Sequence, residues 1–276
     1  MRWVHVFAAI LWIGQTYLFN WFERNLEADS GTPPNVVGSL WMVHGGGFYF
    51  VEKQKNPELQ PRTLHWFKWE AATTWLSGVT LLILTYYIGG GGLLVEPDQN
   101  LHVAHAIGFG VVIVGWLVYD LLVLSPVGKH DVILAAIGWV ALVALTFFLR
   151  KFLSSRATYI HVGFLIGTIM AANVWMRILP AQRRMLAAAK EGKVPDAALK
   201  ARGPQRSRHN TFLVIPLVFI MISNHYASIS FGSDYAWAIL GGVLLVGWAV
   251  AKVIRDGMVT GTAASRAKAA AEPGKS

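Results

Sequence analysis

Five histidines fall within long apolar runs of this 276-residue sequence. Ionisable groups inside membrane spans are costly, so each is a functional candidate. If the runs cross a membrane in alternating directions, four helices bring histidines to one depth near the outer face: His5, His102, His105, His161 and His225. Two imidazoles facing each other across a bundle can ligate the iron of a b-type haem. We therefore expect haem b, with His5 and His161 as the metal ligands and His225 and His105 as further cofactor-binding candidates.

Other interpretations of these histidines stay open. Each could instead be an interfacial residue that hydrogen-bonds to lipid headgroups or to backbone. Zinc or copper is less favoured than haem, since neither a thiolate nor a clear carboxylate accompanies the imidazoles.

A second layer of polar groups is expected near the inner ends of the apolar runs. It contains His44, Glu52, His65, Lys68, Glu70, Asp120, Arg177, Arg206 and His209. These groups could bind a polar, planar anion. In that interpretation Glu70, His65 and Asp120 are catalytic, and the substrate-binding residues are Arg177, His44, Lys68 and His209. In the alternative, structural interpretation Lys68 extends toward the membrane surface, and Glu70 or Asp120 pairs with Arg177 to hold helices together.

Composition places these groups in a membrane protein. Hydrophobic residues make up 54% of the chain, charged residues only 14%, and the mean hydropathy is +0.46. A soluble domain carries nearer a quarter charged residues, so an ordinary soluble enzyme is excluded. The chain has no cysteine, which excludes disulfides, Cys-ligated metals and a covalently attached c-type haem. The net charge is +9, and the basic residues lie mostly between the apolar runs. This distribution indicates membrane topology and not nucleic-acid binding.

The predicted fold is an all-α polytopic bundle of seven to eight membrane segments. Seven runs approach the length of about 20 residues that a span needs: Trp3–Phe22, Ala71–Val95, Leu101–Leu124, Val132–Leu149, Ala157–Met176, Asn210–Ser233 and Tyr235–Ala251. We expect one transmembrane domain over residues 1–256 and a tail over 257–276. Residues 34–65 are expected to form an interfacial or re-entrant segment on the cytoplasmic side. The first run starts at the initiator methionine without a cleavage motif, so we expect an anchor and not a signal peptide.

Basic residues predict the orientation. The loop Ala181–Arg208 carries eight Lys or Arg residues and is expected in the cytoplasm, whereas Gly89–Asn100 carries none. Alternation then places the N-terminus in the periplasm and the C-terminus inside a bacterial inner membrane. The short loop Arg150–Arg156 runs against this rule, with three basic residues on the outer side.

Several long motifs resemble the bacterial membrane-bound urate hydroxylase family, and together they cover nearly the whole chain in order. The matching stretches are Trp3–Val6, Ala8–Gly14, Phe19–Trp21, Val43–Tyr49, Val51–Lys53, Leu64–Ala71, Tyr159–Gly163, Met170–Val174, Gln205–Asn210 and Phe219–Tyr226. The resemblance implies oxidation of urate to 5-hydroxyisourate, with electrons passed through haem b to a cytochrome c.

One departure from the family pattern bears on partners. In that family a C-terminal cytochrome c domain follows the membrane part, and this sequence has neither that domain nor any cysteine. We therefore expect either a separate cytochrome c or other redox partner, or an accessory subunit, non-catalytic or electron-transferring, in a larger respiratory or photosynthetic membrane complex. A transporter is disfavoured, because no internal repeat pair with matched broken helices is evident.

Overall fold

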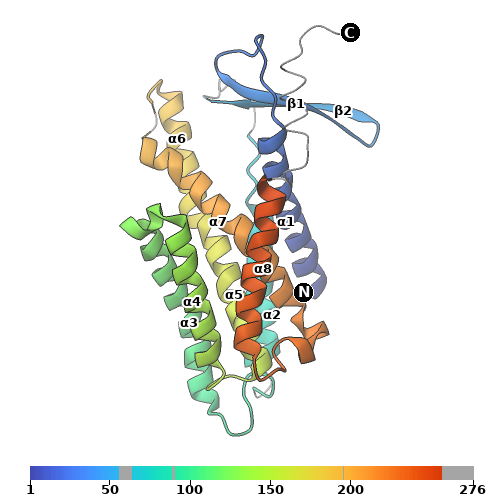
Figure 1. Cartoon of the computed structure of the whole chain (residues 1–276), viewed down its shortest axis with the longest axis vertical. Coiled ribbons are helices and arrows are strands. Elements are labelled where there is room, and N and C mark those ends of the chain that lie inside the picture. The colour runs from blue at the N-terminus through green and yellow to red at the C-terminus, as the bar shows by residue number, and fades with distance from the viewer. Residues whose placement is uncertain (56–63, 89–90, 195, 257–276) are drawn as a thin grey trace.

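The structure is a computed structural model that describes residues 1–55, 64–88, 91–194 and 196–256. Long helices run side by side along its longest axis, and a small hairpin lies across one end (Figure 1). The helices are α1 (Arg2–Asn25), α2 (Trp69–Leu82), α3 (Leu101–Leu124), α4 (Asp131–Leu149), α5 (Ser155–Ala172), α6 (Leu179–Lys190), α7 (Ala197–Ile222) and α8 (Ala236–Asp256). The predicted all-α class agrees with this largely helical chain.

Side-chain caps fix the beginnings of the central helices. Asn100 accepts hydrogen bonds from the backbone N–H groups of His102 and Val103, so α3 begins at the expected Leu101. Ser154 caps α5 through the N–H of Ala157, and Asp196 caps α7 through that of Ala198. These side chains satisfy N–H groups that the first helical turn leaves without partners.

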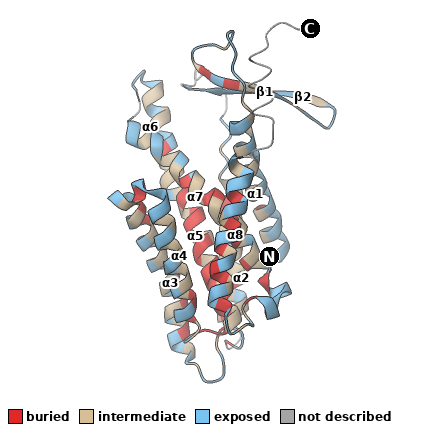
Figure 2. Cartoon of the chain, viewed as in Figure 1, coloured by how far each residue is buried: buried red, intermediate tan, exposed pale blue. Residues whose placement is uncertain are grey.

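Helix α5 lies in the middle of the bundle and carries more buried residues than any other helix (Figure 2). It packs against α2, α3, α4 and α7, while α1 packs mainly on α2 and α8 packs on α7 and α4. The main core therefore forms around α5, from residues such as Tyr159, Val162 and Ile166. Helices α3 and α4 expose large apolar side chains on their outer faces, as lipid-facing helices do.

Two helices change to π-helical geometry partway along. Segment η1 (Ile83–Tyr87) continues α2, and segment η3 (Asn173–Ile178) joins α5 to α6, so that one helical run extends from Ser155 to Lys190. Such π-segments place extra residues on one side of a helix and are frequent at functional sites.

The segment after α1 forms an antiparallel hairpin. Strands β1 (Val36–His44) and β2 (Gly47–Gln54) pair from His44↔Gly47 outward, and Gly45 and Gly46 of the turn both have positive φ. A two-residue turn of this kind requires φ > 0 at both positions, which glycine adopts without steric cost. The expected interfacial or re-entrant segment is thus a hairpin across the end of the bundle, and the remainder of that segment, residues 56–63, lies outside the described residues.

Within the described part of the chain, four helical runs are long and apolar enough to cross a membrane. They are Leu101–Leu124, Asp131–Leu149, Ser155–Lys190 and Ala236–Asp256. These runs are compatible with a membrane protein. The larger number of seven to eight segments stays a prediction, as does the tail, which also lies outside the described residues.

Candidate functional site

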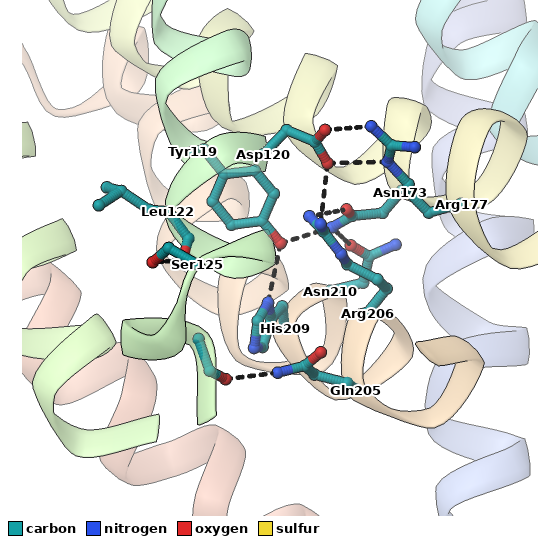
Figure 3. Close-up of polar contacts among 11 residues, drawn as sticks. Tyr119, Asp120, Leu122, Ser125, Asn173, Arg177, Gln205, Arg206, His209 and Asn210 are labelled. Carbon is teal, nitrogen blue, oxygen red and sulfur yellow. Dashed lines mark hydrogen bonds and ion pairs between the residues drawn. The ribbon is translucent and has the colours of Figure 1, made fainter. Parts of the chain in front are cut away.

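A buried cluster of polar side chains joins α3, η3 and α7 (Figure 3). We call it the arginine cluster; its members are Tyr119, Asp120, Asn173, Arg177, Arg206, His209 and Asn210. At its centre Asp120 accepts two hydrogen bonds from Arg177, one of them from Nε at 2.9 Å. The guanidinium of Arg206 lies 2.8 Å from the same carboxylate. Asp120 is therefore the counter-ion of two arginines, which come from two other helical segments.

Neutral groups complete the arginine cluster. Asn173 donates to the hydroxyl of Tyr119 and to the side-chain oxygen of Asn210, both at 2.9 Å, and it accepts from Arg206 at 3.2 Å. The hydroxyl of Tyr119 lies 2.8 Å from Nδ1 of His209. Figure 3 shows that these contacts form one connected network. Such networks fix helices in register when their members are satisfied.

The charge of the arginine cluster is not balanced. Two guanidinium groups face one carboxylate, and Arg206 is only 1% exposed. Its Nε has no hydrogen-bond partner among the described residues. The Asp120–Arg177 contact matches the structural interpretation of these residues, because it engages two of the donor groups that Arg177 would otherwise offer to a substrate.

A separate open pocket lies at the beginning of α2, and we call it the tryptophan pocket. Its volume is about 310 Å³, and its lining is Leu64, His65, Trp66, Lys68 and Trp69. Nζ of Lys68 lies 5.2 Å from the ring centre of Trp69 and 6.0 Å from that of Trp175 on η3. No carboxylate pairs with Lys68 in the described part of the chain. A planar anion can be held by such a combination of aromatic faces and one cation.

Glu70 lies beside the tryptophan pocket. It lines a second open cleft of about 290 Å³ between α1 and α2, and Trp69 lines both cavities. One carboxylate oxygen of Glu70 is buried without a hydrogen-bond partner among the described residues, and so is Nε1 of Trp175. Unpartnered buried polar groups are rare and indicate sites where a ligand or water completes the bonding.

The outer histidines do not form one set. His161 is fully buried on α5, where Nδ1 donates to the backbone oxygen of Ala157 at 2.7 Å. Nε2 therefore carries the lone pair, and it accepts a hydrogen bond of 2.7 Å from Tyr87. The ring of Tyr87 also lies 5.2 Å from that of His105 on α3. Nε2 of His105 is buried without a partner among the described residues.

His5 lies at another level, and the expectation of a common depth is wrong for it. Nδ1 of His5 contacts the backbone oxygen of Thr74 at 2.9 Å and the hydroxyl of Ser77 at 3.1 Å. A Cβ on Gly78 would approach its ring to 3.0 Å. Gly78 marks the level of His5 on α2, and Tyr87, which contacts His161, marks the level of His161. The two are nine residues apart, which is about 13 Å along a helix. The cause is that α1 packs with its first turn halfway along α2.

The remaining predicted residues are dispersed. His225 is exposed in the turn after α7, His102 is exposed at the start of α3, and His44 is exposed at the hairpin turn. His65 lies in the tryptophan pocket, where its ring is 4.6 Å from that of Phe67. The inner layer thus divides into the arginine cluster, with Asp120, Arg177 and His209, and the tryptophan pocket, with His65, Lys68 and Glu70 beside it.

Sequence reasoning missed several contributors, among them Tyr119 and Asn210 of the arginine cluster. Tyr87 and Trp175 sit in the π-segments η1 and η3, and Asn173 begins η3. Asn173 carried a signal, because an amide inside an apolar span is as conspicuous as a charge. Tyr87 and Trp175 carried none, since aromatic residues are common at membrane interfaces.

Of the histidines expected to bind haem, His105 and His161 could ligate one iron together, whereas His5 could not join His161. His105 and His161 suit iron chemically, since one Nε2 has no partner and the other has its lone pair directed by the Nδ1 contact. They come from facing helices at one level, where a Cβ on Gly108 would meet both Tyr87 and His161. The phenol of Tyr87 lies against both imidazoles. His5 and His161 cannot ligate one iron in this arrangement.

Comparison with known proteins identifies the family of this chain. The family described as urate oxidase N-terminal matches residues 1–269. Neither the curated proteins nor the solved structures gave a match. Because the match spans nearly the whole sequence and every residue of both candidate sites, this chain belongs to the urate oxidase N-terminal family.

Proposed function

We propose that this chain is a membrane-bound protein that oxidises urate to 5-hydroxyisourate. The observation that carries the proposal is its membership of the urate oxidase N-terminal family over residues 1–269. In the balanced reaction, urate gains the oxygen of one water molecule and loses two protons and two electrons. The protein must therefore hold a planar anion, accept protons and pass electrons onward.

The tryptophan pocket is the place we propose for the substrate. Its volume of about 310 Å³ is at the lower end of the range for small-ligand sites. Trp66 and Trp69 offer flat surfaces for a purine ring, and Lys68 offers a cation without a paired carboxylate among the described residues. His65 lines the same pocket, and in this proposal it orients the attacking water.

Glu70 is the proton acceptor in this proposal. Glu70 lines the cleft that adjoins the tryptophan pocket through Trp69, and one of its carboxylate oxygens has no hydrogen-bond partner among the described residues. A haem b held by His105 and His161 would, when bound, take up electrons one at a time for a separate cytochrome c or other redox partner. The chain's own residues bind the anion, orient the water and remove the protons.

Direct binding tests the proposal. Purified protein in lipid nanodiscs is titrated with urate, and Lys68→Gln is compared with Lys129→Gln, a matched change on the short helix between α3 and α4. We expect Lys68→Gln to weaken urate binding about tenfold, as loss of one charge-assisted contact of about 1.4 kcal/mol does. Lys129→Gln should bind like the unmodified protein. Absence of urate binding to the unmodified protein would refute the proposal.

One observation favours a second function, that of an accessory subunit in a larger membrane complex. The hairpin exposes Trp41 (70%), Val43 (67%) and Phe48 (80%) on one face, where Trp41 pairs with Phe50 and Val43 with Phe48. Exposed apolar faces of this kind are typical of binding surfaces. Protein that binds no urate but co-purifies stoichiometrically with other membrane subunits would support this alternative.

A further inference from the structure

The hairpin is held by direct contacts at the end of a candidate membrane span. Lys53 on β2 forms an ion pair with Glu23 in the last turn of α1. The next residue of α1, Arg24, donates a hydrogen bond of 2.8 Å to the backbone oxygen of Ile254. Ile254 belongs to the last turn of the candidate span Ala236–Asp256. The base of the hairpin therefore lies close to the level at which the apolar run of α8 ends.

The backbone of the hairpin restricts where it can lie. Glu27, just beyond α1, and Ser39 on β1 exchange two backbone hydrogen bonds of 2.9 Å, which fix the sheet to the end of α1. Among the described strands, β2 pairs only with β1. An open strand edge is not tolerated in the hydrocarbon core, because no water is present there to satisfy the backbone groups. The hairpin therefore suits the water-containing interface and not a re-entrant position.

The end of the hairpin, Leu40–Val51, is apolar and exposed, and we call it the hairpin tip. It contains no Asp, Glu, Lys or Arg. Trp41 and Phe50 are cross-strand partners with ring centres 5.0 Å apart, and Val43 and Phe48 form the next pair on the same face. All four side chains are exposed. None of residues 41–50 is buried, so this part of the hairpin stands clear of the bundle.

The hairpin tip lies where lipid would surround the bundle. The hairpin crosses the end of α1, and its exposed part extends beyond the bundle to one side (Figures 1 and 2). Exposed aromatic side chains mark the neighbouring level on the bundle itself. Phe19 and Trp21 are exposed near the end of α1, and the ring of Phe19 lies 5.1 Å from that of Phe67. Aromatic residues gather where a membrane meets water, so these side chains place the interface next to the hairpin.

We propose that the hairpin tip binds the lipid surface, with Trp41, Val43, Phe48 and Phe50 inserted among the headgroups beside the bundle. Apolar contact and not charge supplies the binding, because the tip carries no charged side chain. Its place at the end of a candidate span favours lipid over a protein partner as the occupant of this face. The inference does not depend on urate oxidation.

Labels on introduced cysteines test the proposal, since the chain has no cysteine of its own. Phe48→Cys and, in a separate protein, Val43→Cys carry a polarity-sensitive fluorophore at the hairpin tip. Gln54→Cys carries it at the exposed base of β2, which is about 20 Å from Phe48 along a strand. Each protein is placed as a single copy in phosphatidylcholine nanodiscs. Quenching is measured with brominated lipid in the membrane and with iodide in the water.

We expect brominated lipid to remove most of the emission of both tip labels, and iodide to quench them far less than the label at Gln54→Cys. Adding phosphatidylglycerol or salt should change the quenching at the tip little, because the tip has no charge to be screened. Trp41→Ser, introduced into the Phe48→Cys protein, should make the label more accessible to iodide, since one inserted aromatic side chain is lost. Trp3→Ser, which changes an exposed tryptophan at the other end of α1, should not.

Two results would overturn the inference. If iodide quenches both tip labels and brominated lipid does not, the tip lies in water, and its apolar face is left to a protein partner or to a second copy of this chain. If brominated lipid quenches the tip and base labels equally, the tip is not the element that enters the lipid. Both results are independent of whether the protein oxidises urate, so failure of this inference and failure of the proposed function are separate findings.

Discussion

The guanidinium of Arg206 lies 2.8 Å from a carboxylate oxygen of Asp120, although that carboxylate also accepts two hydrogen bonds from Arg177. Three helical segments, α3, η3 and α7, thus share one negative charge. Removing a partner from a buried ion pair leaves an uncompensated charge, which costs more than the pair itself contributes.

Asp120→Asn should therefore destabilise the protein strongly. Two buried guanidinium groups would lose their counter-ion, at a cost of about 3–5 kcal/mol. For a chain of this size that corresponds to a lowering of the unfolding temperature by roughly 10 °C. The change is measured by heating the protein in detergent and determining the fraction that remains monodisperse at each temperature.

Asp131→Asn is the matched control. Asp131 pairs with Arg208 at 2.8 Å, but the two side chains are 54% and 37% exposed. Exposed pairs contribute about 0–1 kcal/mol, so this variant should unfold close to the unmodified protein. Equal effects of the two changes would mean that Asp120 does not hold the bundle together.

The second prediction concerns Gly108 on α3. A Cβ there would lie 2.1 Å from the hydroxyl of Tyr87 and 2.9 Å from Nε2 of His161. Gly108→Ala should cost about 1–3 kcal/mol by overpacking, whereas Gly110→Ala, with nothing within 4 Å, should be neutral or stabilising.

The double variant Gly108→Ala with Tyr87→Phe tests the cause. Removing the hydroxyl of Tyr87 takes away the closest atom, so part of the lost stability should return. Strict additivity of the two changes would show that Tyr87 and Gly108 are not in contact.

The helices could be predicted from sequence more closely than the site. Helix α3 has the predicted bounds, and α4 and α8 begin within one residue of theirs, because long apolar runs and caps are local signals. The hairpin also had a local signal, Gly45-Gly46 between segments rich in β-branched and aromatic residues. It was missed because the absence of charge favoured a membrane-associated interpretation.

No local sequence pattern predicts the level at which His5 contacts α2. It depends on how far α1 is displaced along α2, and packing between two helices decides that displacement. The division of the inner layer has the same origin. Trp175 and Arg177 are two residues apart on η3, yet one contacts Trp69 and the other Asp120. Sequence spacing alone does not resolve opposite sides of a π-segment.

The third prediction concerns haem. If haem b is bound, His161→Ala and His105→Ala should each bleach or shift its reduced-minus-oxidised spectrum, because iron loses an axial imidazole. His225→Ala should leave the spectrum unchanged, since His225 is exposed beyond the end of α7. The measurement compares spectra of the unmodified protein and the three variants, all purified in parallel. Unchanged spectra of both His105→Ala and His161→Ala, or absence of haem, would refute ligation by this pair.

The fourth prediction contrasts Arg177 with Glu70. Arg177→Lys cannot reproduce the two parallel hydrogen bonds to Asp120, so it should lower stability. Glu70→Gln removes a proton acceptor that lines the cleft and has one oxygen without a hydrogen-bond partner among the described residues, so it should slow urate turnover and leave stability nearly unchanged. Unfolding temperature and turnover are measured for both variants. Weakened urate binding by Arg177→Lys at unchanged stability would move the substrate site to the arginine cluster.

The last prediction is topological, and the absence of cysteine makes it clean. Ala198 is exposed near the start of α7, within the basic loop, and Ser228 is exposed in the turns after the other end of α7. A membrane-impermeant maleimide applied to intact spheroplasts should label Ser228→Cys and leave Ala198→Cys unlabelled until the membrane is permeabilised, because eight basic residues favour the cytoplasm for that loop. The unmodified protein is the background control. Labelling of Ala198→Cys from outside, with Ser228→Cys protected, would reverse the orientation and place the tryptophan pocket on the periplasmic side.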